Sequence, residues 1–299
     1  MMNLQRENII EANQPTTPTL DELISNIKIE IKEHTAKNLE FDLINADCAL
    51  ANSLRRILIS EIPTMAIERV NVKNNTGVLP DETIAHRLGL IPVITDPDQF
   101  QFLSDELDET NTIKFVLKVK NNSGKIMMVS SDIIKWIPIG EQASRIQAPS
   151  LMPGITVTKL APGQELDMEM YCTKNVGTVH AKWSPVCTAT YRTFPVIDIV
   201  EEIVDEEADK LVGCFAPGVI GIRKEKGRRI AYVSNSRLDR TNREVLRHSE
   251  FDEKVILRKK YNHFIFNIET VFLDPLVVLK KGIFILIKKC ESLRNELIK

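Results

Sequence analysis

The segment from Leu50 to Pro92 constrains the fold most, because helix, strand and turn signals follow one another there with few residues between them. Its first part predicts a helix over residues 47–60, whose expected N-cap is Asp47. Apolar residues recur in this part at helical spacing: Leu50, Leu54, Ile57 and Leu58. Pro63 ends the helix, because the residue before a proline is disfavoured in the helical conformation.

A strand and a second, shorter helix complete the segment. Met65, Ile67 and Val70 predict a half-buried strand, with a break in the alternation. Pro80 then opens a helix in which Ile84 and Leu88 lie one turn apart, and Gly89 ends it. The segment therefore predicts a mixed α and β fold.

The composition limits the class of protein. With 299 residues, 43% of them hydrophobic, the chain suits two lobes or one domain with an insertion. Its formal net charge of -2 gives no overall attraction to nucleic acid or membrane. The N-terminus lacks the apolar core of a signal peptide, and the most apolar run, Leu276–Ile287, is too short to span a bilayer. We therefore expect an intracellular protein that is not anchored in a membrane.

The spacing of the cysteines argues against a metal site. The five cysteines are Cys48, Cys172, Cys187, Cys214 and Cys290. No two of them lie two to four residues apart, which is the spacing of zinc ribbons and redox motifs. We therefore expect reduced thiols, no bound metal and no cofactor.

The rest of the chain alternates between strand patterns and two further helix patterns. Residues 1–20 predict a flexible tail, and alternation at 27–31 and 39–43 predicts two antiparallel strands with one face buried. The middle of the chain is rich in strand patterns, and the acidic segment 201–210 predicts a solvated helix. Asp274 followed by a proline predicts the start of a last helix that runs to the end of the chain.

That last helix carries a heptad pattern. Its apolar positions step by three and four: Leu276, Leu279, Ile283, Leu286, Cys290, Leu293 and Leu297. A core helix packed on its own sheet and a helix that also covers a partner both fit this spacing. Residues 282–287 are apolar nearly all round, which favours burial on more than one side.

Five segments together resemble one known family. They are LRRILI at 54–59, NTGVLPDE at 75–82, IAHRLGLIP at 84–92, HAKWSPV at 180–186 and NHFIFNIE at 262–269. Their order resembles that in the alpha-like assembly subunits of multisubunit RNA polymerases. Three further segments look like the branch shared by eukaryotic RNA polymerases I and III: SPVCTATYR at 184–192, CFAPGVIGI at 214–222 and TNREVLR at 241–247. A polymerase II-type or archaeal D-type subunit is the alternative within the family.

The resemblance implies an α+β fold with a discontinuous dimerisation domain, in which an antiparallel sheet carries two long helices. This domain would comprise residues 21–66 and 184–299, interrupted by a strand-rich insert domain at 67–183. The implied role is that of a non-catalytic assembly subunit of nuclear, including nucleolar, polymerases. Its implied partners are a small alpha-like subunit, the two largest subunits and small zinc-binding subunits, with DNA contacted only through the complex.

The resemblance also implies two surfaces. The heterodimer surface would comprise Leu50, Leu54, Ile57, Leu58, Leu279, Ile283, Leu286, Cys290, Leu293 and Leu297. The docking surface for the second-largest subunit would comprise Arg55, Arg56, Asp81, Glu82, His86, Arg87 and Leu88.

Three other functions compete with this one. An enzyme would need its histidines, such as His86, His180 and His263, in a catalytic motif, and none lies in one. A nucleic-acid-binding protein would use the basic segment 223–229, which has no interleaved aromatic residues and suits a hairpin tip or a protein docking surface better. A homodimer would use the same heptad, which by itself does not exclude it.

Overall fold

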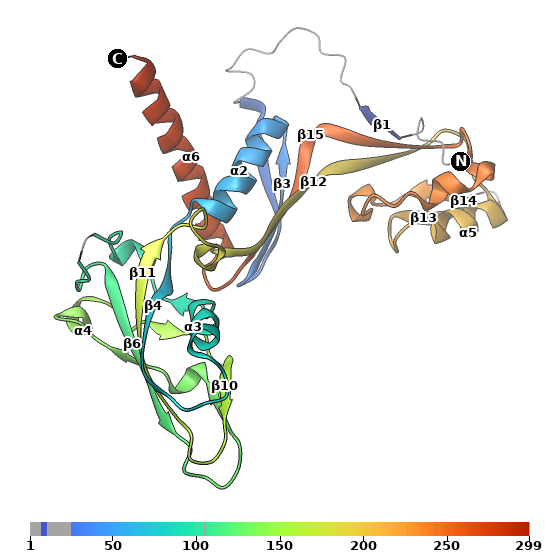
Figure 1. The fold of residues 1–299 in the computed structure, drawn as a ribbon. Helices are drawn as coiled ribbons and strands as arrows, with labels where there is room; N and C mark the ends of the chain where they lie inside the picture. The colour runs from blue at the N-terminus through green and yellow to red at the C-terminus, as the bar shows by residue number, and fades with distance from the viewer. Residues whose placement is uncertain (1–6, 11–24, 105, 226, 299) are drawn as a thin grey trace. The chain divides into compact units, whose positions relative to one another are not determined.

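The computed structural model describes residues 7–10, 25–104, 106–225 and 227–298, which form the α+β fold that the sequence predicts (Figure 1). Of the flexible tail predicted for residues 1–20, the four residues Glu7–Ile10 form strand β1. The other residues of that tail lie outside the described residues.

A five-stranded sheet is built from both ends of the chain. The order is β1, β15, β3 and β2, and β12 also pairs with β15. The remaining strands are β2 (Lys28–His34), β3 (Asn38–Ile44), β12 (Val186–Ile199) and β15 (Val255–Thr270). β3 buries Leu39, Phe41 and Leu43, as its alternation predicts. β2 differs from the prediction of a buried face, because all of its residues are exposed at the edge of the sheet.

Two helices follow the predicted signals. Helix α2 (Cys48–Ser60) begins directly after Asp47, and helix α6 (Pro275–Leu297) begins after Asp274. The carboxylate of Asp274 accepts a hydrogen bond from the backbone N–H of Leu276 at 2.9 Å, so it caps α6 as expected. At Gly282 the helices approach so closely that an added Cβ would lie 2.9 Å from a methyl carbon of Leu58.

The strand-rich middle of the chain forms a four-stranded antiparallel sheet in the order β4, β11, β6 and β8. Its strands are β4 (Thr64–Asn75), β6 (Thr112–Lys120), β8 (Lys135–Ile137) and β11 (Glu165–Asn175). Helix α3 (Asp81–Gly89) inserts Ile84 and Leu88 into the core of this insert, where both are fully buried.

Two short ladders and a short helix complete the insert. β7 (Met127–Ser130) pairs with β10 (Thr156–Leu160). β5 (Val93–Ile94) pairs with β9 (Ser150–Leu151), and α4 spans Gln142–Arg145.

A separate core lies at 197–257. Helix α5 (Asp205–Gly213) packs on the hairpin of β13 (Ile220–Glu225) and β14 (Arg228–Val233) and buries Ala208 and Leu211. The acidic segment is therefore a helix with one buried face, and the basic segment is the hairpin that the sequence predicts.

Internal packing divides the chain into two compact units. One comprises residues 1–34, 39–53 and 190–267, and the other comprises 35–38, 54–189 and 268–299. This division groups α6 and the C-terminal part of α2 with the insert, whereas the sequence-based division groups both helices with the five-stranded sheet.

Candidate protein–protein interface

The apolar stripe of α2 lies in the chain's own core. Leu54, Ile57 and Leu58 are each at most 5% exposed, and Leu50 is half-buried. Side chains that are already covered offer little area to a second protein. The structure therefore places these three predicted interface residues beneath the surface, where they support neighbouring residues but do not contact a partner directly.

The heptad seam of α6 changes from buried to exposed along the helix. Leu279 is buried, and Ile283 and Leu286 are half-buried. Cys290, Leu293 and Leu297, the last three of the predicted seam residues, are exposed. Only the C-terminal half of the predicted seam is therefore open to a partner.

Three apolar residues on the face of α6 next to the seam are more open than the middle of the seam. Val277, Phe284 and Ile287 are 40%, 55% and 49% exposed, and we call them the α6 stripe. At 100° per residue they lie within about 80° of one another and face away from the buried Val278 and Gly282. An exposed row of large apolar residues marks an interaction surface.

The sequence contains a signal for this stripe. Residues 282–287 are apolar nearly all round, so one sheet leaves part of the segment uncovered. The Nζ atom of Lys288 lies 4.5 Å from the centroid of the Phe284 ring, which holds the ring at the surface through a cation–π contact.

Two ion pairs fix α6 beside this stripe. Lys281 Nζ lies 2.8 Å from Asp98 Oδ2, and Lys289 Nζ lies 2.7 Å from Glu61 Oε1. The stripe is thus presented by a helix that is tied to the insert at one end and to the segment after α2 farther along.

Five of the seven predicted docking residues are at least partly open to solvent. Arg56 and three α3 residues, Asp81, Glu82 and His86, are exposed, and Arg55 is half-buried.

Two further docking residues have structural roles. Leu88 is fully buried, so its side chain cannot contact a second protein, and its assignment to the docking surface is wrong. Arg87 donates hydrogen bonds from Nε to the carbonyl of Val157 at 2.9 Å and from Nη2 to that of Thr156 at 2.6 Å. Arg87 therefore holds α3 against β10.

Two of the three histidines of the competing enzyme hypothesis have structural partners, and the third, His86, is exposed on α3. The backbone N–H of Lys182 donates to Nδ1 of His180 at 3.1 Å. His263 Nε2 lies 3.2 Å from Asp42 Oδ2, and its ring stacks on Phe194. Among the described residues, no three His, Cys, Asp or Glu side chains are arranged to hold a metal ion.

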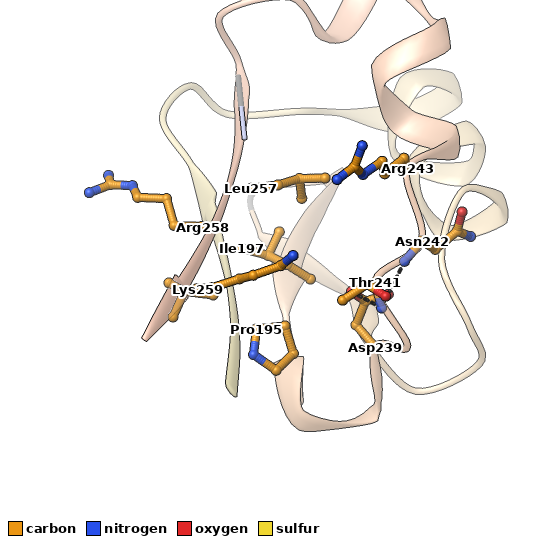
Figure 2. A pocket seen from close by; sticks show the side chains of 10 residues that line it. Pro195, Ile197, Asp239, Thr241, Asn242, Arg243, Leu257, Arg258 and Lys259 are labelled. Atoms are coloured by element: carbon orange, nitrogen blue, oxygen red, sulfur yellow. Dashed lines mark hydrogen bonds between the residues drawn. The ribbon is translucent and has the colours of Figure 1, made fainter. Parts of the chain in front are cut away.

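A small hollow beside β12 and β15 also has its polar groups satisfied by the chain (Figure 2). It has room for about 10 Å³, close to one water molecule. The carboxylate of Asp239 accepts the backbone N–H groups of Thr241 and Asn242 at 3.1 and 3.3 Å. These amides are therefore not available to bind an anion.

The basic hairpin is partly neutralised by α5. The guanidinium of Arg229 donates to both carboxylate oxygens of Asp209, at 2.7 and 2.5 Å. Asp205 accepts the backbone N–H of the same arginine at 3.1 Å. Acidic groups so close to the hairpin weaken its attraction for phosphate groups.

No helix among the described residues is long and apolar enough to cross a membrane.

An exposed apolar face on a helix is typical of a protein that contacts another chain. Residues 40–290 match the family model of the RNA polymerase Rpb3/Rpb11 dimerisation domain. The chain belongs to this family.

Sequence similarity to individual members indicates which branch of the family this chain resembles most. The mouse "DNA-directed RNA polymerases I and III subunit RPAC1" is 38% identical over 91% of this chain and 85% of its own length. The Saccharomyces cerevisiae protein of the same name is 38% identical over 90% of this chain and 87% of its own length. The Dictyostelium discoideum "DNA-directed RNA polymerase II subunit rpb3" is 36% identical over 65% of this chain and 68% of its own length.

Proposed function

We propose that the chain is a non-catalytic assembly subunit shared by nuclear RNA polymerases I and III. The α6 stripe is the observation that carries this proposal, because an uncovered apolar helix face needs a partner in solution. Similarity to subunits of polymerases I and III over about nine-tenths of the chain supports this branch. Similarity to a polymerase II subunit extends over only 65% of the chain.

The partner on α6 would be a small alpha-like subunit. The surface offered to it would be the α6 stripe together with the exposed end of the seam, Cys290, Leu293 and Leu297. The two largest subunits would then assemble on this pair and supply the active site. This role accounts for a chain in which His180 and His263 have structural partners.

The second-largest subunit would dock on Arg56 and the exposed acidic end of α3. Arg56 is exposed on α2, so its side chain is open to a second protein. An arginine at the centre of an interface contributes about 2 kcal/mol or more. A nuclear and nucleolar location follows from this role.

A reconstitution tests the pairing. We would coexpress the chain with its small alpha-like partner and replace Phe284 and Ile287 together by Asp. Two carboxylates in an apolar interface would have to be desolvated or protonated, so we expect the pair to be lost. The matched control replaces Ile126 and Met128, which are 71% and 60% exposed on the insert, by Asp.

The result has two clear outcomes. Loss of the partner from the stripe variant but not from the insert control supports the proposal. Recovery of the partner at the wild-type yield with the stripe variant would show that α6 is not the interface. Affinity purification of the wild-type chain from native extract should also recover two very large subunits, identified by mass spectrometry.

A further inference from the structure

A groove next to the start of α6 is not part of either predicted surface. It has a volume of about 520 Å³, and three chain segments line it: 94–99, 147–150 and 272–281. We call it the α6 groove. Its size lies in the range of pockets that bind ligands or short peptide segments.

The α6 groove is continuous with the α6 stripe. Val277 lines the groove and is also the first residue of the stripe. Phe284 lies seven residues later, which turns the helix by only about 20° from the direction of Val277. A chain that covers Phe284 and Ile287 therefore reaches the mouth of the groove without crossing to another face.

The lining of the α6 groove combines apolar and hydrogen-bonding groups. Ile94 and Val277 are 37% and 40% exposed and form apolar surface. Gln99, Gln147 and Ser150 are exposed in the same groove and supply both donors and acceptors. Such groups match the N–H and C=O groups of an extended backbone.

One carboxylate in the groove favours a cationic side chain on the occupant. Its lining carries three carboxylates, those of Asp96, Asp98 and Asp274, against the single ammonium of Lys281. Lys281 already pairs with Asp98, and Lys174 lies within electrostatic reach of Asp96 and Asp98. The carboxylate of Asp274 caps α6, so Asp96 is the groove carboxylate that bears on the charge of an occupant. Asp96 forms no ion pair with another described residue, so it remains to attract a cation.

We infer that the α6 groove holds an extended segment of the small alpha-like partner, with an apolar side chain against Val277 and a cationic one beside Asp96. This inference rests on the proposed function. The groove lengthens the interface beyond the helix pair, and it ties the partner to the insert as well as to α6.

Photo-crosslinking within the purified heterodimer tests the inference. We would place p-benzoylphenylalanine at Gln147 in the groove and, as the matched control, at Ile126, which is exposed elsewhere on the insert. We expect a crosslink from Gln147, but not from Ile126, to one short segment of the partner, located by mass spectrometry. An intact heterodimer with no such crosslink would overturn the inference and leave the proposed function standing. Failure of the pair to form would overturn both.

A blocking variant gives an independent measurement. Ala148 is exposed in the groove, so Ala148→Trp should fill the groove without disturbing the core. We expect it to raise the Kd for the partner at least about tenfold, with an unchanged Tm. Ile126→Trp should leave the Kd unchanged. An unchanged Kd for Ala148→Trp would contradict the inference.

Discussion

At the scale of single residues, the most consequential cluster in the sheet joins Asp42, Arg237 and His263. Arg237 Nη2 donates to Asp42 Oδ1 at 2.8 Å, and a second nitrogen of the same guanidinium donates to Glu40. Burial by itself raises the pKa of Asp42, but the hydrogen bonds from Arg237 and His263 outweigh burial and hold the pKa below its ordinary value. The cluster therefore fastens the loop of Arg237 to strands β3 and β15.

Removing the side chain of Arg237 should lower the free energy of unfolding. In Arg237→Ala the carboxylate of Asp42, which is 3% exposed, would keep its charge but lose its main partner. We expect the free energy of unfolding to fall by about 3 kcal/mol, measured by denaturant titration. Arg228→Ala, on the exposed hairpin, should change it by less than about 0.5 kcal/mol. Equal small effects of both variants would contradict this role.

The same cluster predicts a pH dependence. Burial lowers the pKa of His263 below its ordinary value of 6.5, although the hydrogen bond to Asp42 opposes this change. Both His263 and Asp42 thus bind protons less readily in the folded chain than in the unfolded chain. The contribution of these two groups to the free energy of unfolding is therefore fully present above about pH 6.5. It is lost as the pH falls, first through the folded pKa of His263 and then through that of Asp42.

Replacing the histidine tests the upper part of this window. His263→Gln should flatten the dependence of unfolding free energy on pH just below the ordinary histidine pKa, while the loss at lower pH through Asp42 remains. The measurement is urea denaturation at a series of pH values. An unchanged slope for the variant would exclude His263 as the titrating group.

At the scale of secondary-structure elements, α6 has two different halves. Its first half buries Val278, Leu279 and Gly282 within the chain. From Lys288 to the end of the described helix every residue is exposed, so no buried apolar side chain holds this half, and the ion pair between Lys289 and Glu61 lies near its start. Helices in water gain most of their stability from packing, and an unpacked half of this length is marginal.

Hydrogen exchange should separate the two halves. In the isolated chain we expect the backbone amides after Lys288 to exchange at least about a hundredfold faster than those near Leu279, because local opening costs little there. Addition of the small alpha-like partner should protect the exposed half. Unchanged exchange in the purified heterodimer would show that the partner binds elsewhere.

At the scale of the whole molecule, buried amide side chains hold the loop before β6 by hydrogen bonds. Asn111 donates from Nδ2 to Ser104 Oγ at 3.1 Å and to the carbonyl of Glu106 at 2.9 Å. Gln142 donates from Nε2 to the carbonyls of Glu109 at 2.8 Å and Thr112 at 2.6 Å. Both amide side chains are buried, so their hydrogen bonds are costly to lose.

We therefore expect the purified chain to contain less than about 0.1 equivalent of zinc or iron, because the described residues offer no cluster of metal ligands. Chelation should then leave the thermal unfolding curve unchanged. Elemental analysis checks the first statement and differential scanning calorimetry the second. One metal ion per chain would contradict the expectation.

Local sequence signals predicted the elements well, because those signals act over short distances. The N-cap at Asp274, the buried pair on α3 and the hairpin of the basic segment all follow from neighbours in sequence. The family followed from five separated motifs, and the match over residues 40–290 confirms it. The edge position of β2 could not be predicted, because alternation does not show whether a second layer covers a strand.

The candidate surface was predicted only in part, because the sequence pattern does not show which helix face other segments cover. Helical spacing by itself determined which residues of α6 lie on one face, since the angle between side chains depends only on their separation in sequence. Only the tertiary structure decided which face is covered. Packing from distant segments buries Leu88 and the α2 stripe and leaves Phe284 and Ile287 exposed. The chain's own sequence therefore determined the elements and the family, and contacts between distant segments decided which side chains remain for a partner.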